Sequence, residues 1–478
     1  MVGGASLVLS HLIWKVLLKP FWWEWRYPLP GPRRTSWLMG NLPDILQEEP
    51  TEPHIRWSRT YPDAPIIRYF IAHTMRIVLT EAALAKKVLT DVETFTKNMP
   101  EYGLLSDITG YSLLTTADVD FHKKQRKICN QAFKYESVLN FMPLFSKASQ
   151  NIISKWNNLI TQSPNNEALI EVSKETGSLT LDIIGLGAFS YKFNSLLEDD
   201  PNNLAHKYLA LFTTVRPSIL SLLPGARHYP IPRIMLRKKL LKEIREEVSN
   251  IIQSRRNEPQ NSGNDLLGIL LNENISDSEL LDLCLTFMVA GHETTSMALS
   301  WTMHALSKHP EVERKCREEI VRVLGEDGEV TKENISQLVY LGQTLNESLR
   351  LFAPVPVVAR KVEKDVELGG YQIPKGCTVV VSPSVLHRNK KYWDNPEKFD
   401  PERWNNKSHG SWFIPFIDGP RNCIGKKFAI VEATVILANM IRKFSFSFSE
   451  DHPFRKTQNI TLHAKPGLFI KVKQAQQQ

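Results

Sequence analysis

The sequence predicts a mainly α-helical body with small β-sheets, and three patterns in it support this fold class. A helical pattern runs for about thirty residues from Ser276 to Pro310, and apolar residues recur at helical spacing after Cys423. Short runs with strand character occupy residues 66–79 and 444–449. Hydrophobic residues make up 42% of the 478 residues and charged ones 23%, as in ordinary globular proteins.

Net charge and cysteine usage narrow the class of protein. The formal charge of +8 favours an anionic partner, either a membrane surface or an acidic protein. No nucleic-acid-binding motif is present, so we expect no nucleic acid partner. The five cysteines are odd in number and widely separated, which argues against a disulfide framework and a zinc site and favours a reducing compartment.

The N-terminal 27 residues are predicted to be a membrane anchor, followed by a body at 28–478. Residues 5–18 are mostly apolar, but the run is shorter than the ~20 residues that span a bilayer. The tryptophans and basic residues after it suit a membrane interface, so the anchor either spans the bilayer or lies in its surface. A cleaved signal peptide is the rival reading, but no convincing cleavage site follows. The proline-rich residues 28–32 form a stiff hinge.

Four further segments of the chain have patterns that predict local structure. Residues 66–79 predict a β-hairpin, and residues 98–118 predict a long loop of the kind that forms a binding-site wall. Residues 167–193 contain an apolar helical segment that predicts core packing. The apolar, proline-containing residues 218–234 are flanked by basic residues, which fits a second membrane-touching patch or an ordinary amphipathic helix and loop equally well.

The longest predicted helix carries the first candidate catalytic residues. Ser276 and Glu279 form a capping box at its start. In its middle, Gly291 precedes Glu293 and Thr294 within the sequence AGHETTS. A carboxylate beside hydroxyls in mid-helix is a poor structural choice but a usable proton relay, although a polar helix face is the simpler alternative.

The stretch around Cys423 carries the second candidate site. Arg421 and the predicted helix after the cysteine both favour the thiolate form, which is the form that acts as nucleophile or metal ligand. Gly419 and Gly425 allow tight turns or the close approach of a flat, bulky group. The pattern predicts a large ligand bound through sulfur.

The spacing of Phe416, Gly419, Arg421, Cys423 and Gly425 resembles the haem-binding signature of the cytochrome P450 monooxygenases of the eukaryotic microsomal type. The resemblance extends along nearly the whole chain. It implies the cytochrome P450 fold, with haem b between a long central helix and the cysteine loop. It also implies that the cysteine thiolate is the axial iron ligand, that the phenylalanine shields the sulfur and that the arginine reaches a haem propionate. A buried structural cysteine is the plainer alternative, which five matched positions disfavour.

The resemblance assigns more residues to the haem propionates. Arg126 and Arg360 match positions that bind these carboxylates in the family. His122 matches a third such position, but the family usually has tryptophan there, so His122 departs from the family pattern. In the sequence around Arg126, the neighbouring lysines are expected to be solvated.

A structural cluster is implied as well. Glu347 and Arg350 lie one turn apart on a predicted helix, and Arg403 lies in the later sequence PERW. The resemblance implies a buried cluster of these three residues that holds the loop before the cysteine. Trp404 stands where the family usually has phenylalanine, a minor departure.

These implications predict an enzyme that uses O2 to oxidise a lipophilic small molecule, with electrons from NADPH through NADPH–cytochrome P450 reductase. The body is expected to face the cytosol from the endoplasmic reticulum membrane. Basic residues are expected to receive the reductase: Lys123, Lys124, Lys127, Lys426, Lys427, Arg442 and Lys443. Two alternatives remain: a haem-thiolate isomerase or dehydratase that needs no O2, and a non-catalytic haem sensor or carrier.

Overall fold

A computed structural model describes residues 10, 14, 18–198, 200, 202–215, 229–257, 265–405 and 410–475. They fall into two compact units, drawn from chain segments that alternate along the sequence. The first unit takes Met1–Glu101, Arg350–Lys398 and Asn406–Cys423, and the second takes Tyr102–Leu349, Phe399–Asn405 and Ile424–Gln478. Because the chain passes repeatedly between the units, no single linker separates them, which is why the sequence reads as one body.

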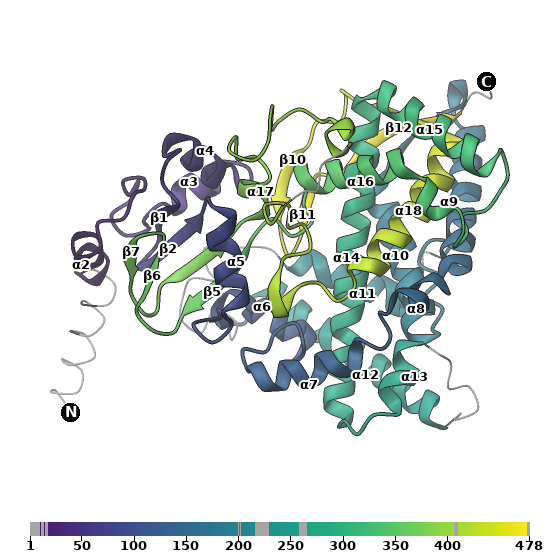
Figure 1. The fold of residues 1–478 in the computed structure, drawn as a ribbon. Coiled ribbons are helices and arrows are strands. Elements are labelled where there is room, and N and C mark those ends of the chain that lie inside the picture. The colour runs from purple at the N-terminus through teal and green to yellow at the C-terminus, as the bar shows by residue number, and fades with distance from the viewer. Residues whose placement is uncertain are drawn as a thin grey trace. The chain divides into compact units, whose positions relative to one another are not determined.

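The first unit is built on a five-stranded sheet in the order β1-β2-β8-β5-β3 (Figure 1). The predicted hairpin is confirmed: β1 (Ile66–Ile71) pairs antiparallel with β2 (Thr74–Leu79). β2 then pairs with β8 (Thr378–Val381) in parallel, while the remaining pairs are antiparallel. The apolar side chains of these strands are almost fully buried, so the sheet forms the core of this unit.

The other elements of the first unit cover or extend this sheet. They are α2 (Lys19–Arg26), α3 (Leu42–Gln47), α4 (Glu52–Thr60), α5 (Ala82–Thr90), β3 (Phe95–Lys97), β5 (Val358–Val362), β6 (Val366–Leu368), β7 (Tyr371–Ile373), α17 (Pro383–Leu386) and η8 (Gly419–Arg421).

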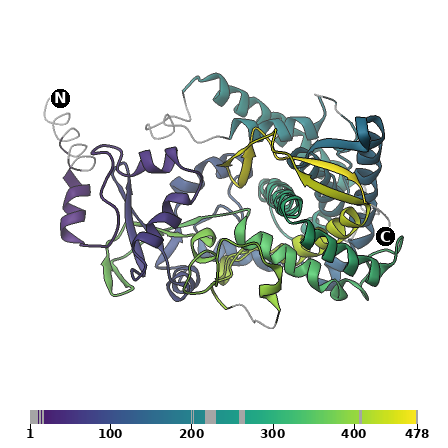
Figure 2. The same cartoon turned by 90° about the horizontal axis from the view of Figure 1, so that it is seen from above.

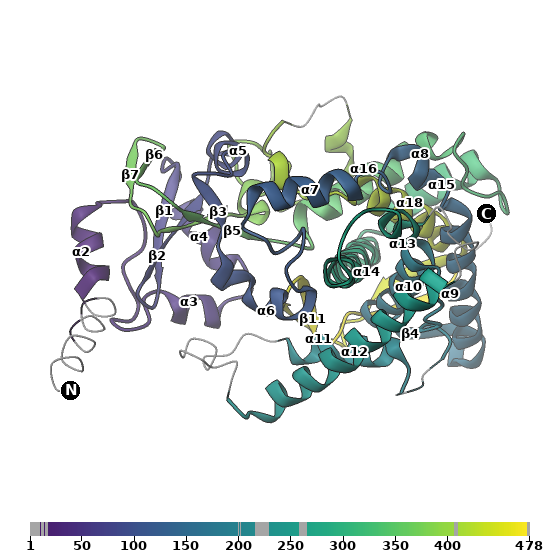
Figure 3. The ribbon, with the colours of Figure 1, turned by 90° about the horizontal axis from the view of Figure 1, so that it is seen from below.

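The second unit is mainly helical and is organised around α14 (Asp277–Lys308), which Figures 2 and 3 view nearly along its axis. Its 32 residues span ~48 Å. The predicted capping box is present, with Ser276 Oγ accepting from the Glu279 backbone and the Glu279 carboxylate accepting from the Ser276 backbone. α10 (Val172–Phe189) packs along α14, and a Cβ at Gly291 would lie 2.7 Å from the Ile184 side chain. Gly291 therefore permits the close packing of two helices.

The remaining elements of the second unit surround this pair of helices. They are α6 (Met99–Thr109, which begins in the first unit), α7 (Val119–Cys129), α8 (Tyr135–Leu139), α9 (Met142–Gln162), η2 (Pro164–Asn166), β4 (Glu167–Glu171), α11 (Leu204–Thr214), α12 (Pro232–Asn257), α13 (Leu266–Leu271), α15 (Pro310–Leu324), η6 (Ile335–Gln337), α16 (Val339–Leu351, which ends in the first unit), η7 (Pro401–Trp404), α18 (Lys426–Lys443), β9 (Phe444–Phe448), β10 (Arg455–Gln458), β11 (Leu462–Lys465) and β12 (Phe469–Gln474).

Two sequence predictions differ from the structure. The loop predicted over residues 98–118 is wrong in its first half, where α6 forms: a proline near its start favours a helix, but its weak apolar periodicity hides it. The segment 167–193 begins with strand β4, which pairs with β12, before the expected core helix α10. Most of residues 218–234 and of the apolar run 5–18 lies outside the described residues. Within the described part of the chain, no helix combines the length and the apolar character that crossing a bilayer requires.

Candidate active site

The cysteine loop of the first unit is tightly turned. Gly419 has φ +75°, and a Cβ there would lie 2.4 Å from the backbone oxygen of Leu89 in α5, so only glycine fits. The Cys423 backbone N–H donates to the Phe416 oxygen at 2.9 Å, which closes the loop on itself. The backbone thus fixes where the Cys423 side chain stands, and α18 begins three residues later, after Gly425 as its N-cap.

Cys423 differs from the other cysteines in exposure. All five cysteines are among the described residues, and Cys423 is the one that is exposed. Burial raises the pKa of Cys129, Cys316 and Cys377 to about 12 and that of Cys284 still further, so these thiols stay protonated. A ligand that binds through a thiolate therefore has one suitable partner in this chain.

A buried histidine that the sequence analysis missed holds this loop within the first unit. His387 Nδ1 lies 3.0 Å from the Arg350 backbone oxygen, and its Nε2 accepts from the Ile414 backbone N–H at 2.9 Å. Burial lowers the pKa of His387 to about 3, so its ring is neutral, with the proton on Nδ1. Arg350 in turn donates to backbone oxygens of His387, Pro396 and Lys398. The arginine thus organises the segment that precedes the cysteine loop.

Three cations of the first unit lie within electrostatic reach of one another. Lys97 of β3 and Arg360 of β5 are cross-strand partners and are 8% and 3% exposed. Burial lowers the pKa of Lys97 well below its usual value, and the charges of Arg360 and Arg421 lower it further. Opposed like charges destabilise a sheet, and a carboxylate ligand relieves that repulsion. This set fits the two carboxylates of haem, and it adds Lys97, which sequence reasoning missed because a lysine in a short strand carries no signal by itself.

The second unit carries the acid and alcohol on α14. Thr294 is half-buried, and its hydroxyl donates to the Ala290 oxygen at 2.7 Å. Glu293 is 4% exposed and accepts from Thr461 Oγ1 at 2.9 Å and from His463 Nε2 at 2.6 Å. Burial favours the neutral carboxyl, but the hydrogen bond and positive charge of His463 outweigh it and lower the pKa of Glu293. Glu293 therefore rests as a carboxylate.

The neighbour of this pair, His292, is packed in the interior of the second unit. It is buried at 2% exposure against the rings of Tyr208 and Phe212 of α11. Burial lowers its pKa, and neither ring nitrogen has a hydrogen-bond partner.

Glu347 is fully buried in the second unit. Its carboxylate accepts from Arg403 Nε at 2.9 Å, from the Asp400 backbone N–H at 2.9 Å and from Trp404 Nε1 at 3.0 Å. Trp404, which stands where the family usually has phenylalanine, thus adds a donor to the carboxylate. Arg350 lies on the same helix, α16, and donates to the backbone oxygens named above.

The residues assigned to α7 lie in the second unit. His122 is 4% exposed and Arg126 is half-buried, one turn apart on the helix. The Asp118 side chain caps the helix by accepting from two backbone N–H groups. Lys123, Lys124 and Lys127 are exposed, as expected of a solvated face.

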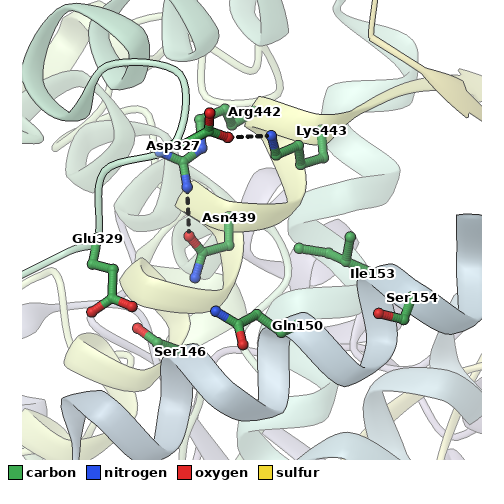
Figure 4. Close-up of a pocket in the computed structure, with 9 residues that line it drawn as sticks. All are labelled: Ser146, Gln150, Ile153, Ser154, Asp327, Glu329, Asn439, Arg442 and Lys443. Atoms are coloured by element: carbon green, nitrogen blue, oxygen red, sulfur yellow. Dashed lines mark hydrogen bonds and ion pairs between the residues drawn. The ribbon is translucent and has the colours of Figure 1, made fainter.

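A pocket of about 220 Å³ lies elsewhere in the second unit, between α9 and the C-terminal end of α18 (Figure 4). Arg442 and Lys443 line it, with Lys443 Nζ 3.0 Å from Asp327 Oδ1 and Arg442 donating to Asn439. None of the residues predicted to bind haem or to deliver protons lines this pocket. Arg442 and Lys443 also stand ~26 Å along α18 from Lys426, so they do not extend the basic face at its N-terminal end.

Comparison with known proteins agrees with this geometry. The family profile described as Cytochrome P450 matches residues 29–471. The chain is 29% identical to "Cytochrome P450 monooxygenase sphH" of Aspergillus fumigatus, over 98% of this chain and 92% of that protein. It is 30% identical to a cytokinin hydroxylase of Arabidopsis thaliana, over 88% and 83%. It is 29% identical to cytochrome P450 4A24 of Sus scrofa, over 93% and 90%.

The match covers nearly the whole chain, and the mainly helical structure with small sheets agrees with the predicted fold. The exposed cysteine on a glycine-fixed loop and the buried cations suit the cofactor of that family. The chain therefore belongs to the cytochrome P450 family and is a haem-binding enzyme, a cytochrome P450 monooxygenase.

Proposed function

We propose that this enzyme inserts one oxygen atom from O2 into a lipophilic small molecule, with electrons from NADPH delivered by NADPH–cytochrome P450 reductase. The observation that carries the proposal is that one chain holds both an exposed Cys423 on a constrained loop of the first unit and an acid and alcohol on α14 of the second. Haem bound through a thiolate supplies the O2 chemistry. A hydroxylation is favoured, since a relative of this chain is named a hydroxylase.

Each site residue has a role in this proposal. Cys423 is the thiolate ligand, and Phe416 lies beside it in the same loop. Gly419 allows the tight turn before the cysteine, and Gly425 is the N-cap of α18 after it. The haem carboxylates are bound by cations and a histidine, namely Lys97, His122, Arg126, Arg360 and Arg421.

Glu293 and Thr294 are proposed to deliver protons to the oxygen chemistry. Replacing Thr294 with Ala removes the hydroxyl that donates to the Ala290 backbone oxygen. The helix stays intact, because alanine is the best helix former. We expect NADPH consumption to continue while product per NADPH falls about tenfold and hydrogen peroxide rises. Glu293→Gln is expected to slow turnover. Coupling assays that measure NADPH, peroxide and product check this, and full coupling in both variants would remove the pair from the mechanism.

The substrate is proposed to be a terpenoid or another lipophilic secondary metabolite. Lipophilic candidates are screened for a shift of the haem spin state, which reports displacement of water near the iron. The screen selects the compound used in the turnover experiments below.

The reductase is proposed to dock on basic residues of the second unit. Lys426 and Lys427 are exposed at the start of α18, and Lys427 Nζ lies 5.5 Å from the centre of the Tyr135 ring in α8. α8 follows the helix that carries the exposed Lys123, Lys124 and Lys127. A surface of this sign attracts an acidic partner over a distance, and salt screens that attraction.

We also propose that the enzyme is held at the cytosolic face of the endoplasmic reticulum membrane by its N-terminal segment. On α2, Phe21, Trp22 and Trp25 are 40%, 41% and 78% exposed, and the neighbouring Trp37 is 62% exposed. Such amphipathic rings suit a membrane interface. The anchor boundary at residue 27 stays a prediction, but Trp23 is only 5% exposed and belongs to the core of the first unit.

Two truncations separate anchoring from folding. Removing residues 1–18 is expected to weaken membrane attachment and to leave the free energy of unfolding unchanged. Removing residues 1–27 also takes away Trp23 and Glu24, whose carboxylate lies 2.9 Å from Arg68, and is expected to cost ~3 kcal/mol or more. Flotation with vesicles and urea unfolding measure the two effects. Equal stability of both truncated proteins would show that α2 is not part of the folded body.

A further inference from the structure

The buried Glu293 carboxylate is held by a hairpin from the C-terminal part of the second unit. β10 and β11 pair antiparallel, with Gln458 opposite Leu462, and the turn between them ends at Thr461. The indole N–H of Trp301, two turns along α14 from Glu293, donates to the Leu462 oxygen at 2.9 Å. This bond fixes the hairpin against α14, so Thr461 and His463 meet the carboxylate in a defined position.

The three polar groups form a closed arrangement. Oε1 of Glu293 lies 2.9 Å from Thr461 Oγ1 and 2.6 Å from His463 Nε2. These two atoms are 2.9 Å from each other. The Glu293 and Thr461 side chains are buried, while the His463 side chain is 23% exposed. His463 therefore contacts both water and a carboxylate that water does not reach.

The other groups that face Glu293 are not suited to carry protons from solvent. His292 Nδ1 on the same helix lies 3.7 Å from Oε2, but this ring is 3% exposed and burial lowers its pKa. Tyr208 of α11 is fully buried, and burial together with the charge of Glu293 raises its pKa well above the usual value. The Thr461 hydroxyl is not an acid or base that could carry a proton from solvent. Among the described residues around Glu293, this leaves His463 as the basic group that is open to solvent.

We propose that His463 loads Glu293 with protons from solvent, an inference that rests on the proposed monooxygenase function. The imidazole is first protonated from solvent to imidazolium. Its Nε2–H bond then breaks as an Oε1–H bond forms on Glu293, which leaves neutral imidazole with its proton on Nδ1. Once Glu293 has moved away from Nε2, a proton from solvent on this nitrogen restores the imidazolium. Oxidation of a substrate by O2 with two electrons from NADPH consumes two protons and releases one water, so the site is loaded twice per product.

The same step loosens the carboxyl group. Before transfer, the pair is an ion pair with a charge-assisted hydrogen bond; after transfer, both partners are neutral, and such bonds are about half as strong. A neutral Glu293 is then able to turn away from His463 and release its proton toward the side of α14 that carries Thr294. His463 is a positioning residue in this account, since it acts through Glu293.

Variants of His463 test this directly. In His463→Gln the amide still donates to Glu293 but has no proton to transfer. With reductase and NADPH, and the compound selected by the spin-state screen, we expect product formation to fall about tenfold or more. With hydrogen peroxide as oxygen donor, which brings its own protons, we expect product within twofold of the wild type.

The matched control is His206→Gln, because His206 is an exposed histidine on α11 and is expected to leave both routes unchanged. A His463→Gln enzyme that keeps its reductase-driven rate would overturn the proposal. Equal losses by both routes would also overturn it, because they would mean that the substitution disturbs the haem site. Failure of the wild type by both routes would instead refute the proposed function.

A second readout needs no turnover. Burial raises the pKa of Glu293, and the hydrogen bond and charge of His463 oppose this effect, so we expect its pKa to rise and the carboxyl to gain a proton when His463 is removed. Infrared spectroscopy of the haem-loaded protein at pH 7 is expected to show the C=O stretch of a protonated carboxyl in His463→Ala. Because burial raises the pKa of Glu432 well above its usual value, the wild type has a protonated carboxyl of its own, and the test is therefore the difference spectrum. An added band is expected in His463→Ala relative to the wild type, and none in the double variant with Glu293→Gln. If it is absent from His463→Ala, the imidazole does not control the proton on Glu293, and the proposal falls.

Discussion

Replacing Cys423 with Ser is expected to abolish thiolate ligation of the haem. The reduced, carbon-monoxide-bound protein should then lose its red-shifted absorption band. The physical reason is that Cys423 is exposed at the end of a loop, and Gly419 fixes the backbone of that loop. Burial keeps the other thiols protonated. We expect product formation with reductase and NADPH to fall with the band, because thiolate donation favours O–O cleavage.

The controls for this prediction are the single replacements of the other four cysteines, namely Cys129, Cys284, Cys316 and Cys377, by Ala. Each is expected to keep the red-shifted band, although loss of a buried side chain lowers the free energy of unfolding by ~1 kcal/mol. A Cys423→Ser protein that kept the band would show that the ligand is another residue.

Replacing Glu347 with Ala is expected to destabilise the second unit by ~3–5 kcal/mol. The carboxylate is fully buried and accepts from Arg403, Trp404 and the Asp400 backbone. Its removal takes this carboxylate away from the charged Arg403 side chain, which is only 10% exposed. Urea unfolding at pH 7 measures the free energy of unfolding, and the fraction of protein that retains haem reports the effect on the site.

The matched control is Glu318→Ala, which breaks an exposed ion pair with Arg314 on α15. Exposed pairs contribute little, so we expect a change of ~0.5 kcal/mol or less. If the two variants lost equal stability, the Glu347 contacts would not be a major source of stability in this unit.

Local patterns predicted much of the fold. The capping box at Ser276 and the stop before Pro310 fixed the limits of α14 to within about two residues, because helix ends depend on nearby side chains. Residues 444–448 of the alternating run form β9, and residues 66–79 form the hairpin, for the same reason. α6 was missed because its apolar residues do not follow a helical stripe.

The contacts at the candidate site were predictable only where a motif spans them. Gly419 and Cys423 lie in one short motif, whereas His463 meets Glu293 across 170 residues of sequence. No periodicity in the sequence predicts such a pair, since the contact depends on how the hairpin packs against α14. The same holds for His387 and Ile414, and for Lys97, whose meaning comes from its partner Arg360 in the neighbouring strand.

The central claim is that this enzyme transfers an atom of O2 to its substrate, and isotope labelling tests it most directly. The full-length protein is incubated with reductase, NADPH, 18O2 and the compound selected by the spin-state screen, and the product is analysed by mass spectrometry. We predict a product that carries one 18O atom and forms only when NADPH is present. A product that forms without NADPH or carries no 18O would contradict the account and indicate an isomerase or dehydratase.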